Sequence, residues 1–504
     1  MPNKAVTFRP RTALKGCATG LAVSITVLAI ACATNPATGK REFSLMSEDQ
    51  EIQIGQSQDA EVRKEMGVYG DRALQQYVSD IGLRLAQLSE RPNLPWHFTI
   101  VDVPAINAFA LPGGYIYITR GILPFLQDEA QLAGVLGHEI GHVTARHASQ
   151  QYSRSTGAQL GLILGSIFVP ATRPFAQLGE SGLGLLMLKY SRDDEAQADG
   201  LGVKYVARAG WDPDGIPQML TTLGRIEEAS DNKGVPNWLQ THPAAEDRVQ
   251  RVQVAVRDAE RGAESPAPPG SPAPRFRVEH DEYLKRMDGI VYGDNPDQGV
   301  VRGATFLHAN LRFAIEFPPG WDVTNGQTQV VAREPGEQPV MLLQVIQRPT
   351  GRTVQEVALR QMEGAGFRPL SGGRTTINGL DAFVGTYEGT LQDFGRAGIR
   401  AAHIVHERSV FLLAGIAPER TYQRLEPIFG KSLDSFRPIT RAEAESIHPN
   451  RIDLYTARPG DTWQAIAERA GKGVVKASTL AIMNGHAVND QPRAGERLKI
   501  VVAG

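Results

Sequence analysis

Cysteine is nearly absent from this chain, which has only Cys17 and Cys32 among its 504 residues. So few cysteines exclude a disulfide-rich scaffold and a metal site made of thiolates. An excess of one charge is absent too, because 53 Lys and Arg residues face 55 Asp and Glu residues, for a net charge of −2. No global basic field attracts a polyanion, so we expect no nucleic acid among the partners.

A long hydrophobic run is also missing near the N-terminus. The apolar stretch 17–31 has ~15 residues, whereas a membrane-spanning helix needs about 20. Basic residues precede this stretch, at Lys4, Arg9, Arg11 and Lys15, as in a secretory signal. The stretch ends in Ala31-Cys32, which resembles the processing site of bacterial lipoproteins. We therefore expect a lipoprotein signal peptide at 1–31 and lipidation of Cys32, with an ordinary signal peptide or an uncleaved anchor as the alternatives.

The length indicates several domains, since one domain usually has roughly 100–200 residues. Proline-rich residues 264–274 mark the clearest boundary, because such a segment forms an extended spacer. We predict a multidomain chain with a mainly α domain that has a small β-sheet, then an α+β antiparallel-sheet domain, then a small βααβ module. The expected boundaries are a signal peptide at 1–31, a tether at 32–46, the mainly α domain at 47–260, a Pro-rich linker at 261–300, the α+β domain at 301–440 and the module at 452–503.

Local patterns predict individual elements. Apolar residues on one face predict a helix at 71–89, and β-branched residues predict strands at 98–101 and 115–119. A helix should run from near Asp128 to beyond Arg146. The apolar, glycine-rich segment 156–188 predicts a buried helical hairpin or a cover over the site, since its halves are too short to span a bilayer. In the α+β domain we expect helices at 353–363 and 419–429 and strands at 312–317, 340–346, 382–387 and 410–414.

The segment His138-Glu139-Ile140-Gly141-His142 carries the strongest chemical signal. Helical residues four apart lie on one face, so both imidazoles can bind one metal ion. Glu139 points away from that pair and can reach the water molecule that attacks a substrate. The pattern is typical of zinc-dependent peptidases, and histidines without a metal are the alternative.

A catalytic zinc site needs a third protein ligand beside an open position. Glu195 is the best candidate, because it lies in the acidic helix start 191–199. Asp199 shares a helical face with Glu195 and could accept the second N–H of a ligand histidine, although such acidic pairs also occur on solvated helices. His147 lies five positions after His142, which turns it off the metal face, and we predict that it is a surface residue.

These motifs together resemble peptidase family M48. The resemblance covers about residues 32–258 and rests on 138–142, on Glu195-Ala196-Gln197-Ala198-Asp199, on 107–114, and on Thr241-His242-Pro243 with Arg248. It implies a zincin-type (gluzincin) metalloprotease domain with one Zn²⁺ per chain, bound by His138, His142 and Glu195, and with Glu139 as general base. It also implies catalytic positions for His242 and Arg248, which would stabilise the oxyanion or, in some members, mask the zinc until activation.

Substrate binding is expected to use backbone pairing, because an extended peptide can add to an exposed strand edge. The edge lies at 107–111 or at 115–119. For the first of these, Asn107, Ala108, Phe109 and Ala110 are the substrate-binding residues. Such pairing favours unfolded or misfolded proteins as substrates.

The two appended domains resemble binding modules rather than enzymes. Residues 311–321 are similar to the opening of PsbP-like domains, and no catalytic residue is identified there. Residues 455–502 resemble a LysM module, whose Gly460-Asp461-Thr462 turn and Leu480–Asn484 turn would flank a groove for glycan. Trp463 and Gly485 depart from that pattern, so peptidoglycan binding and simple packing both remain open.

The function expected from these features is a zinc endopeptidase of the periplasm that cleaves misfolded or stalled outer-membrane proteins. The lipid on Cys32 would hold it to a membrane, and Ala33-Thr34 after the cysteine favours the outer one. Two alternatives remain: a peptidoglycan-associated binding or scaffold protein, and a hydrolase of peptidoglycan cross-links.

Overall fold

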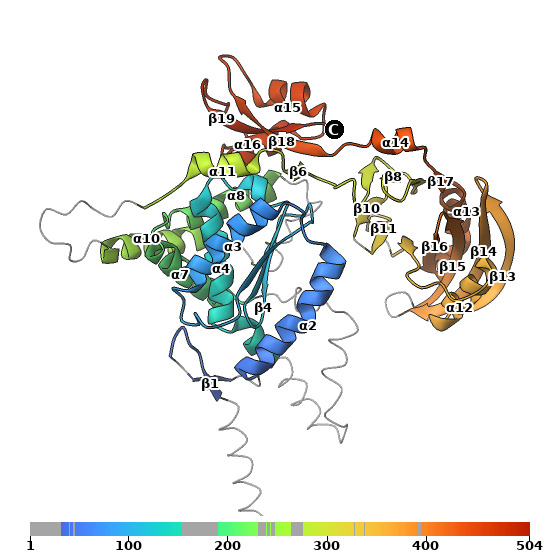
Figure 1. Cartoon of the computed structure of the whole chain (residues 1–504), viewed down its shortest axis with the longest axis horizontal. Helices are drawn as coiled ribbons and strands as arrows, with labels where there is room; N and C mark the ends of the chain where they lie inside the picture. Colours follow the sequence, from blue (N-terminus) through green and yellow to red (C-terminus); the bar gives the residue numbers. More distant parts are fainter. Residues whose placement is uncertain are drawn as a thin grey trace, which may run out of the picture.

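The computed structural model describes residues 32–39, 41–43, 46–153, 190–229, 238, 242, 247–263, 276–326, 328–336, 338–391 and 395–504. The predicted signal peptide, the apolar segment 156–188 and the proline-rich 264–274 lie outside these residues. In the part of the chain that is described, no helix is both long and apolar enough to cross a bilayer. Several bodies of structure follow one another along the chain (Figure 1).

The N-terminal domain is built mainly from helices around a small sheet. Strand β5 (Tyr115–Thr119) is central, with β3 (His97–Val101) parallel on one side and β4 (Ala108–Leu111) antiparallel on the other. The strands expected at 98–101 and 115–119 are therefore confirmed. The helices are α2 (Glu48–Met66), α3 (Arg72–Ala86), α4 (Glu129–Thr144), α7 (Arg192–Arg208), α8 (Gly215–Ala229) and α10 (Arg248–Ala263), with a short 3-10 turn η1 (Leu123–Phe125) before α4.

Side-chain caps set where these helices begin. The side chain of Asp71 accepts a hydrogen bond at the start of α3, Asp128 does so at α4, and Ser191 forms a capping box with Asp194 at α7. Such caps satisfy backbone N–H groups that have no partner within the helix. Every residue of α4 is buried, so α4 is the central helix of the domain.

Helix α4 is shorter than the sequence pattern predicts. It ends at Thr144, and Arg146 adopts the left-handed conformation with φ of 61° before helical residues resume at 147–153. A helix that continues through Arg146 is therefore wrong. The break at Arg146 comes four residues after the second histidine of the motif.

Glycine allows α4 and α7 to pack very closely. A Cβ added at Gly141 would lie 2.8 Å from the carbonyl oxygen of Ala198 and 3.0 Å from its Cα. Real Cβ atoms do not tolerate such contacts, so the backbone of α7 approaches α4 only because position 141 lacks a side chain.

The second body is an α+β domain with an antiparallel sheet. Its main sheet has seven strands in the order β10-β11-β12-β16-β15-β14-β13. Helix α12 (Val354–Gly364) covers one face and α13 (Glu419–Asp434) covers the other. These are the helices expected at 353–363 and 419–429. The strands are β10 (Asp322–Asn325), β11 (Gln329–Arg333), β12 (Val340–Val345), β13 (Arg368–Ile377), β14 (Leu380–Leu391), β15 (Gly395–His406) and β16 (Ser409–Pro418).

A smaller four-stranded sheet lies beside the main one, in the order β17-β9-β8-β7. Its strand β9 is shorter than the strand expected at 312–317, because Arg312 adopts the left-handed conformation with φ of 50° and the strand begins only at Phe313. Its strands are β7 (Val300–Arg302), β8 (Thr305–His308), β9 (Phe313–Glu316) and β17 (Arg437–Pro438), and the short helix α14 (Arg441–Glu445) follows.

The C-terminal module has the predicted β-α-α-β order. It consists of β18 (Asn450–Thr456), α15 (Trp463–Gly471), α16 (Ala477–Met483) and β19 (Arg497–Val502). A strand from far upstream, β6 (Val291–Tyr292), pairs with β18 and extends the sheet to three strands. Residues 276–293, which lie within the linker predicted at 261–300, thus form helix α11 (His280–Met287) and strand β6.

The module and the N-terminal domain share one hydrophobic core, and Figure 1 shows them stacked together. The fully buried Lys499 donates to the backbone oxygen of Leu126 at 2.5 Å, and Gln127 donates to the oxygen of Met483 at 3.1 Å. Both contacts lie just before the N-terminus of α4. The module therefore packs against the end of the helix that carries the histidine motif.

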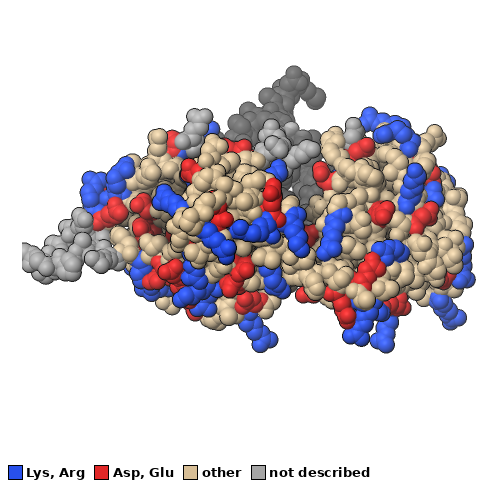
Figure 2. Space-filling model, turned by 90° about the horizontal axis from the view of Figure 1, so that it is seen from above, with Lys and Arg blue, Asp and Glu red and all other residues tan. Residues whose placement is uncertain are grey.

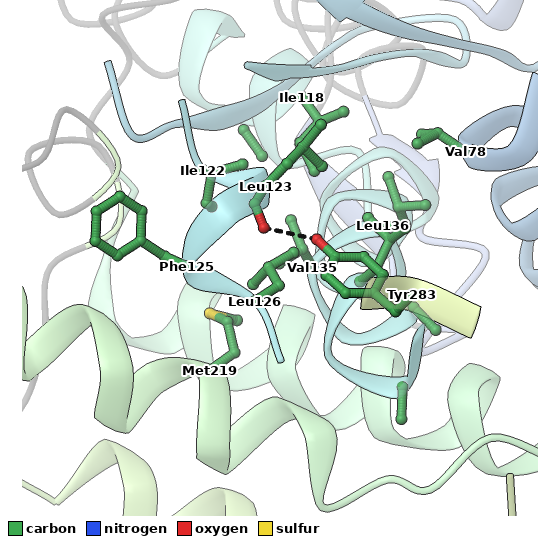
Figure 3. Close-up of a cluster of buried hydrophobic side chains, with 14 of the residues drawn as sticks. Val78, Ile118, Ile122, Leu123, Phe125, Leu126, Val135, Leu136, Met219 and Tyr283 are labelled. Atoms are coloured by element: carbon green, nitrogen blue, oxygen red, sulfur yellow. Dashed lines mark hydrogen bonds between the residues drawn. The ribbon is translucent and has the colours of Figure 1, made fainter. Parts of the chain in front are cut away.

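Helix α11 supports the same region from another side. In Figure 3 the ring of Tyr283 reaches into the core, and its hydroxyl donates to the carbonyl oxygen of Leu123 in η1 at 2.7 Å. Tyr283 is completely buried.

The face seen in Figure 2 carries acidic and basic side chains interspersed, in keeping with the balanced composition.

Candidate metal centre

Helix α4 presents the two motif histidines to one point. The Nε2 atoms of His138 and His142 lie 3.0 Å apart, and both side chains are buried. This proximity follows from their spacing, because residues four apart on a helix project over the same face.

Helix α7 brings a carboxylate to the same point. The Glu195 side chain lies 3.6 Å from Nε2 of His138 and 3.5 Å from Nε2 of His142. The close packing at Gly141 makes this approach possible, since Ala198 of α7 lies directly against it. The three residues expected to bind zinc are therefore together.

His242 is the fourth member of the cluster. Its Nδ1 atom lies 3.2 Å from Nε2 of His138 and 3.0 Å from Oε1 of Glu195. One donor atom from each of His138, His142, Glu195 and His242 lies within 4.8 Å of the others. Trp238 stacks on the His242 ring at 4.7 Å between centroids and holds it there.

The donor set suits a divalent cation such as zinc. Nδ1 of His138 lies 2.9 Å from Oδ1 of Asp199, and this carboxylate favours the tautomer that has its proton on Nδ1 and a lone pair on Nε2. Burial lowers the pKa of His142 well below its ordinary value, which favours the neutral ring that a metal ligand must have. Two lone pairs and a carboxylate that face one another repel unless a cation lies between them, and imidazole with carboxylate is a usual zinc set.

Arg248 connects the two carboxylates behind the cluster. It forms two hydrogen bonds of 2.8 Å to Asp199, and its third nitrogen lies 2.8 Å from Glu195. Burial would raise the pKa of Asp199, but the guanidinium of Arg248 outweighs it and holds that pKa below its usual range. The predicted pairing of Asp199 with a ligand histidine is present, and Arg248 fixes its orientation.

His147 is not a surface residue, so that prediction is wrong. It is buried, with Nδ1 at 2.9 Å from Nδ1 of His142 and Nε2 at 2.8 Å from Oε1 of Gln197. The prediction assumed a continuous helix, whereas the break at Arg146 turns His147 back toward the metal face. His147 thus lies at Nδ1 of His142 and orients that ring, as Asp199 does for His138.

Glu139 lies on the other side of the cluster in a fully buried position. Its Oε1 atom is 3.6 Å from Nε2 of His242. Burial raises the pKa of Glu139 to about 7. A carboxylate with a pKa near neutrality can both accept and return a proton, as general acid–base catalysis requires.

Strand β4 forms the edge of the sheet beside the cluster. It pairs only with β5 among the described strands, so the expected substrate-binding residues Ala108, Phe109 and Ala110 lie on the edge strand, whereas 115–119 is central. The side-chain oxygen of Asn107 is buried and has no hydrogen-bond partner among the described residues. Such an acceptor is available to a ligand N–H.

The predicted tether is attached to the domain. Cys32 begins the short strand β1 (Cys32–Thr34), which pairs with β2 (Arg41–Phe43). The side-chain amide of Asn35 donates to the carbonyl oxygen of Ala145 at 3.2 Å. The residues after Cys32 thus contact the C-terminal end of α4.

Sequence reasoning missed several residues of the site. Trp238 covers His242, Tyr190 stacks on the His142 ring at 4.0 Å between centroids, and Gln197 holds His147. Of these, only Gln197 had a local signal, because it lies in the acidic helix start between Glu195 and Asp199.

Comparison with known proteins agrees with the resemblance seen in the motifs. Residues 72–256 match the sequence model described as Peptidase family M48. The chain is 31% identical over 224 residues to the beta-barrel assembly-enhancing protease of Escherichia coli (strain K12), covering 43% of this chain and 46% of that protein. It is 30% identical over 235 residues to the mitochondrial metalloendopeptidase OMA1 of Schizosaccharomyces pombe, covering 45% of this chain and 66% of that protein.

These similarities concern one part of the molecule. The chain spans about half the length of the first curated relatives that it matches. Among solved structures, the cyanobacterial PsbP (CyanoP) from Synechocystis sp. PCC 6803 covers 29% of this chain and 98% of its own, with a TM-score of 0.24 and 14% identity. Residues 72–256, which match the M48 model, include the histidine motif and Glu195, Asp199, His242 and Arg248.

Proposed function

We propose that this chain is a zinc-dependent endopeptidase of the cell envelope. One observation carries the proposal: α4 and α7 converge so that His138, His142 and Glu195 surround one point with Glu139 beside it. Similarity to peptidase family M48 over this region supports it. His138, His142 and Glu195 would hold one Zn²⁺, which when bound lowers the pKa of a water molecule and polarises the scissile carbonyl.

Glu139 is the general base in this proposal. Its carboxylate would accept a proton from the attacking water and return it to the leaving amine. The buried setting that raises its pKa to about 7 suits both steps. Asp199 and Arg248 would keep His138 and Glu195 in orientation, because each touches one of these ligands.

His242 belongs to the resting form of the site. Its Nδ1 lies 3.2 Å from Nε2 of His138 and 3.0 Å from Oε1 of Glu195, so His242 would fill a fourth position around the metal ion that a substrate carbonyl would otherwise take. Movement of His242 away from His138 would open that position. Once moved, His242 or Arg248 could donate to the oxyanion that forms during hydrolysis.

The substrate would bind as an extended strand along β4. The free edge of Ala108, Phe109 and Ala110 offers backbone groups, and the unpaired oxygen of Asn107 offers one more acceptor. Backbone pairing is nearly independent of sequence and requires an unfolded segment. Misfolded or stalled proteins are therefore the substrate class that fits.

The place of action that we propose is the periplasmic side of the outer membrane, with a lipid on Cys32 as the anchor. The Escherichia coli relative is named a beta-barrel assembly-enhancing protease, which supports outer-membrane proteins as substrates. The tether contact at Asn35 would hold the catalytic domain near the membrane surface.

Casein cleavage by the purified protein tests the proposal. We expect cleavage by the wild type, complete loss in Glu139→Gln with zinc retained, and loss of both zinc and cleavage in His138→Ala. Metal analysis of each variant separates the two defects. Undiminished cleavage by Glu139→Gln would contradict the proposal.

The C-terminal module keeps a second function open, because its β-α-α-β order resembles modules that bind peptidoglycan. A scaffold on peptidoglycan would sediment with purified sacculi and leave casein intact. A cross-link hydrolase would instead release muropeptides, which chromatography of digested sacculi would detect.

A further inference from the structure

A cavity of about 280 Å³ lies where three parts of the chain meet, and we call it the interdomain cavity. The N-terminal domain lines it with Ile106, Phe125 and Ala229, the β6 segment with Tyr292, and helix α16 of the module with Thr479 and Ile482. A volume near 300 Å³ lies at the lower end of the range for ligand sites. It is far larger than a single buried water needs.

The one charged residue of the wall among those described is already engaged. Arg120 donates to Asp102 at 2.6 Å, to the carbonyl oxygen of Val291 at 2.7 Å and to that of Gly293 at 2.8 Å. Its guanidinium therefore holds β6 in place instead of offering a charge to a ligand. The rest of the wall is mainly aliphatic and aromatic, so the cavity suits an apolar group.

The interdomain cavity continues the line of the substrate edge. Pro104 and Ile106 of its wall precede Asn107 and strand β4 directly in the chain. The carbonyl oxygen of Ile106 accepts a hydrogen bond from the backbone N–H of Trp238 at 3.3 Å. Trp238 therefore occupies the edge at Ile106 in this structure, and a substrate strand would take its place there once Trp238 moves away together with His242.

The direction of the substrate follows from strand geometry. A peptide paired antiparallel with β4 runs toward Ile106 and Pro104 on its C-terminal side. Residues 104–107 precede β4 and include a bend at Ala105, so the ~13 Å of four extended residues is an upper limit for the path from Ala108 to Pro104. A peptide whose cleaved bond lies opposite Ala108 would cover this path with about four residues. An apolar side chain at that distance beyond the cleaved bond would reach the cavity.

We propose that the interdomain cavity is a subsite for an apolar side chain of the substrate, about four residues to the C-terminal side of the cleaved bond. This inference rests on the proposed function, because it assigns the cavity to the same extended polypeptide. It gives the C-terminal module a role in substrate selection, since Thr479 and Ile482 supply part of the wall.

Two quenched fluorescent peptides test the subsite. They are identical except for Phe or Ser at the fourth position after the cleaved bond. The wild type should cleave the Phe peptide with kcat/KM about tenfold higher, as expected for an apolar group in an apolar pocket. Thr479→Phe and Ala229→Phe each fill the cavity from a different wall and should bring this ratio close to one. Ala465→Phe adds the same ring at an exposed position of α15 and should keep the ratio.

Binding to the Glu139→Gln protein separates this inference from the proposed function. If the wild type cleaves neither peptide, the proposed function fails, while tighter binding of the Phe peptide by fluorescence anisotropy still supports the subsite. Equal binding and equal cleavage of the two peptides by the wild type would overturn the subsite alone. Two filling variants guard against one that fails to fold, which thermal unfolding would reveal.

Discussion

His147 provides the second nitrogen of His142 with a partner, and this suggests a test at the level of one residue. For His142 to offer Nε2 to a metal, its Nδ1–H must donate to Nδ1 of His147, whose Nε2–H then donates to Gln197. Loss of such a partner typically weakens metal binding by 10–100-fold. We expect His147→Ala to lower zinc affinity by about that factor, as measured by competition with a chromophoric chelator.

The control for this variant is His97→Ala, which removes an exposed histidine of β3. It should leave the zinc affinity unchanged. Equal affinities of His147→Ala and wild type, with both proteins folded, would show that His147 only packs.

Local spacing accounts for how much of the site the sequence could predict. His138 and His142 share a helical turn, and Glu195 and Asp199 share another, so each pair could be recognised without knowing the fold. His147 could not, because its position depends on the break at Arg146. The place of Trp238 was equally hidden, since it depends on the path of a connecting segment rather than on a helical period.

At the scale of elements, the packing of α4 on α7 gives a paired prediction. A methyl group at Gly141 would meet the backbone of Ala198, so Gly141→Ala should push the helices apart and move Glu195 away from the histidines. We expect a loss of about 1–3 kcal/mol in the free energy of unfolding. Zinc affinity should fall as well, and chemical denaturation with metal analysis would measure both.

Gly200 supplies the matched control on α7. A Cβ at that position meets nothing within 4 Å, so Gly200→Ala should stabilise the helix by about 0.5–1 kcal/mol. A Gly141→Ala protein as stable as Gly200→Ala and with full zinc affinity would rule out this account of the packing.

Elements with a clear period were predicted well, and their associations were not. The strand at 115–119 and the helices at 353–363 and 419–429 are present because β-branched or amphipathic patterns decide them locally. The pairing of β6 with β18 joins residues distant in sequence. Nothing in the pattern of two residues, Val291 and Tyr292, could indicate that partner.

At the scale of the whole molecule, Lys499 makes the stability of the domain contact depend on pH. Burial lowers its pKa to about 7, against an ordinary value of 10.5, although Asp128 opposes the shift. Between these two values the unfolded chain binds more protons than the folded one, so stability rises with pH. The rise should approach 1.4 kcal/mol per pH unit, the equivalent of one proton.

Lys499→Met isolates this contribution. The free energy of unfolding of the wild type should increase relative to that of the variant as the pH increases from 7 to 9. Denaturant titrations at fixed salt would measure this difference. Below pH 7 both states of the wild type are protonated, so the difference should become constant. Parallel profiles across the whole range would contradict the buried position of Lys499.

The pairing of β6 with β18 means that the α+β domain is inserted between two segments that complete a single core. During synthesis, the chain that contains α4 and α7 emerges long before β19 and its Lys499. Leu126, just before the N-terminus of α4, therefore stays uncovered by the module until β19 has been made. Assembly of the domain that contains α4 is in this way tied to synthesis of the C-terminal module, and a chain without β19 would lack the contact between Lys499 and Leu126.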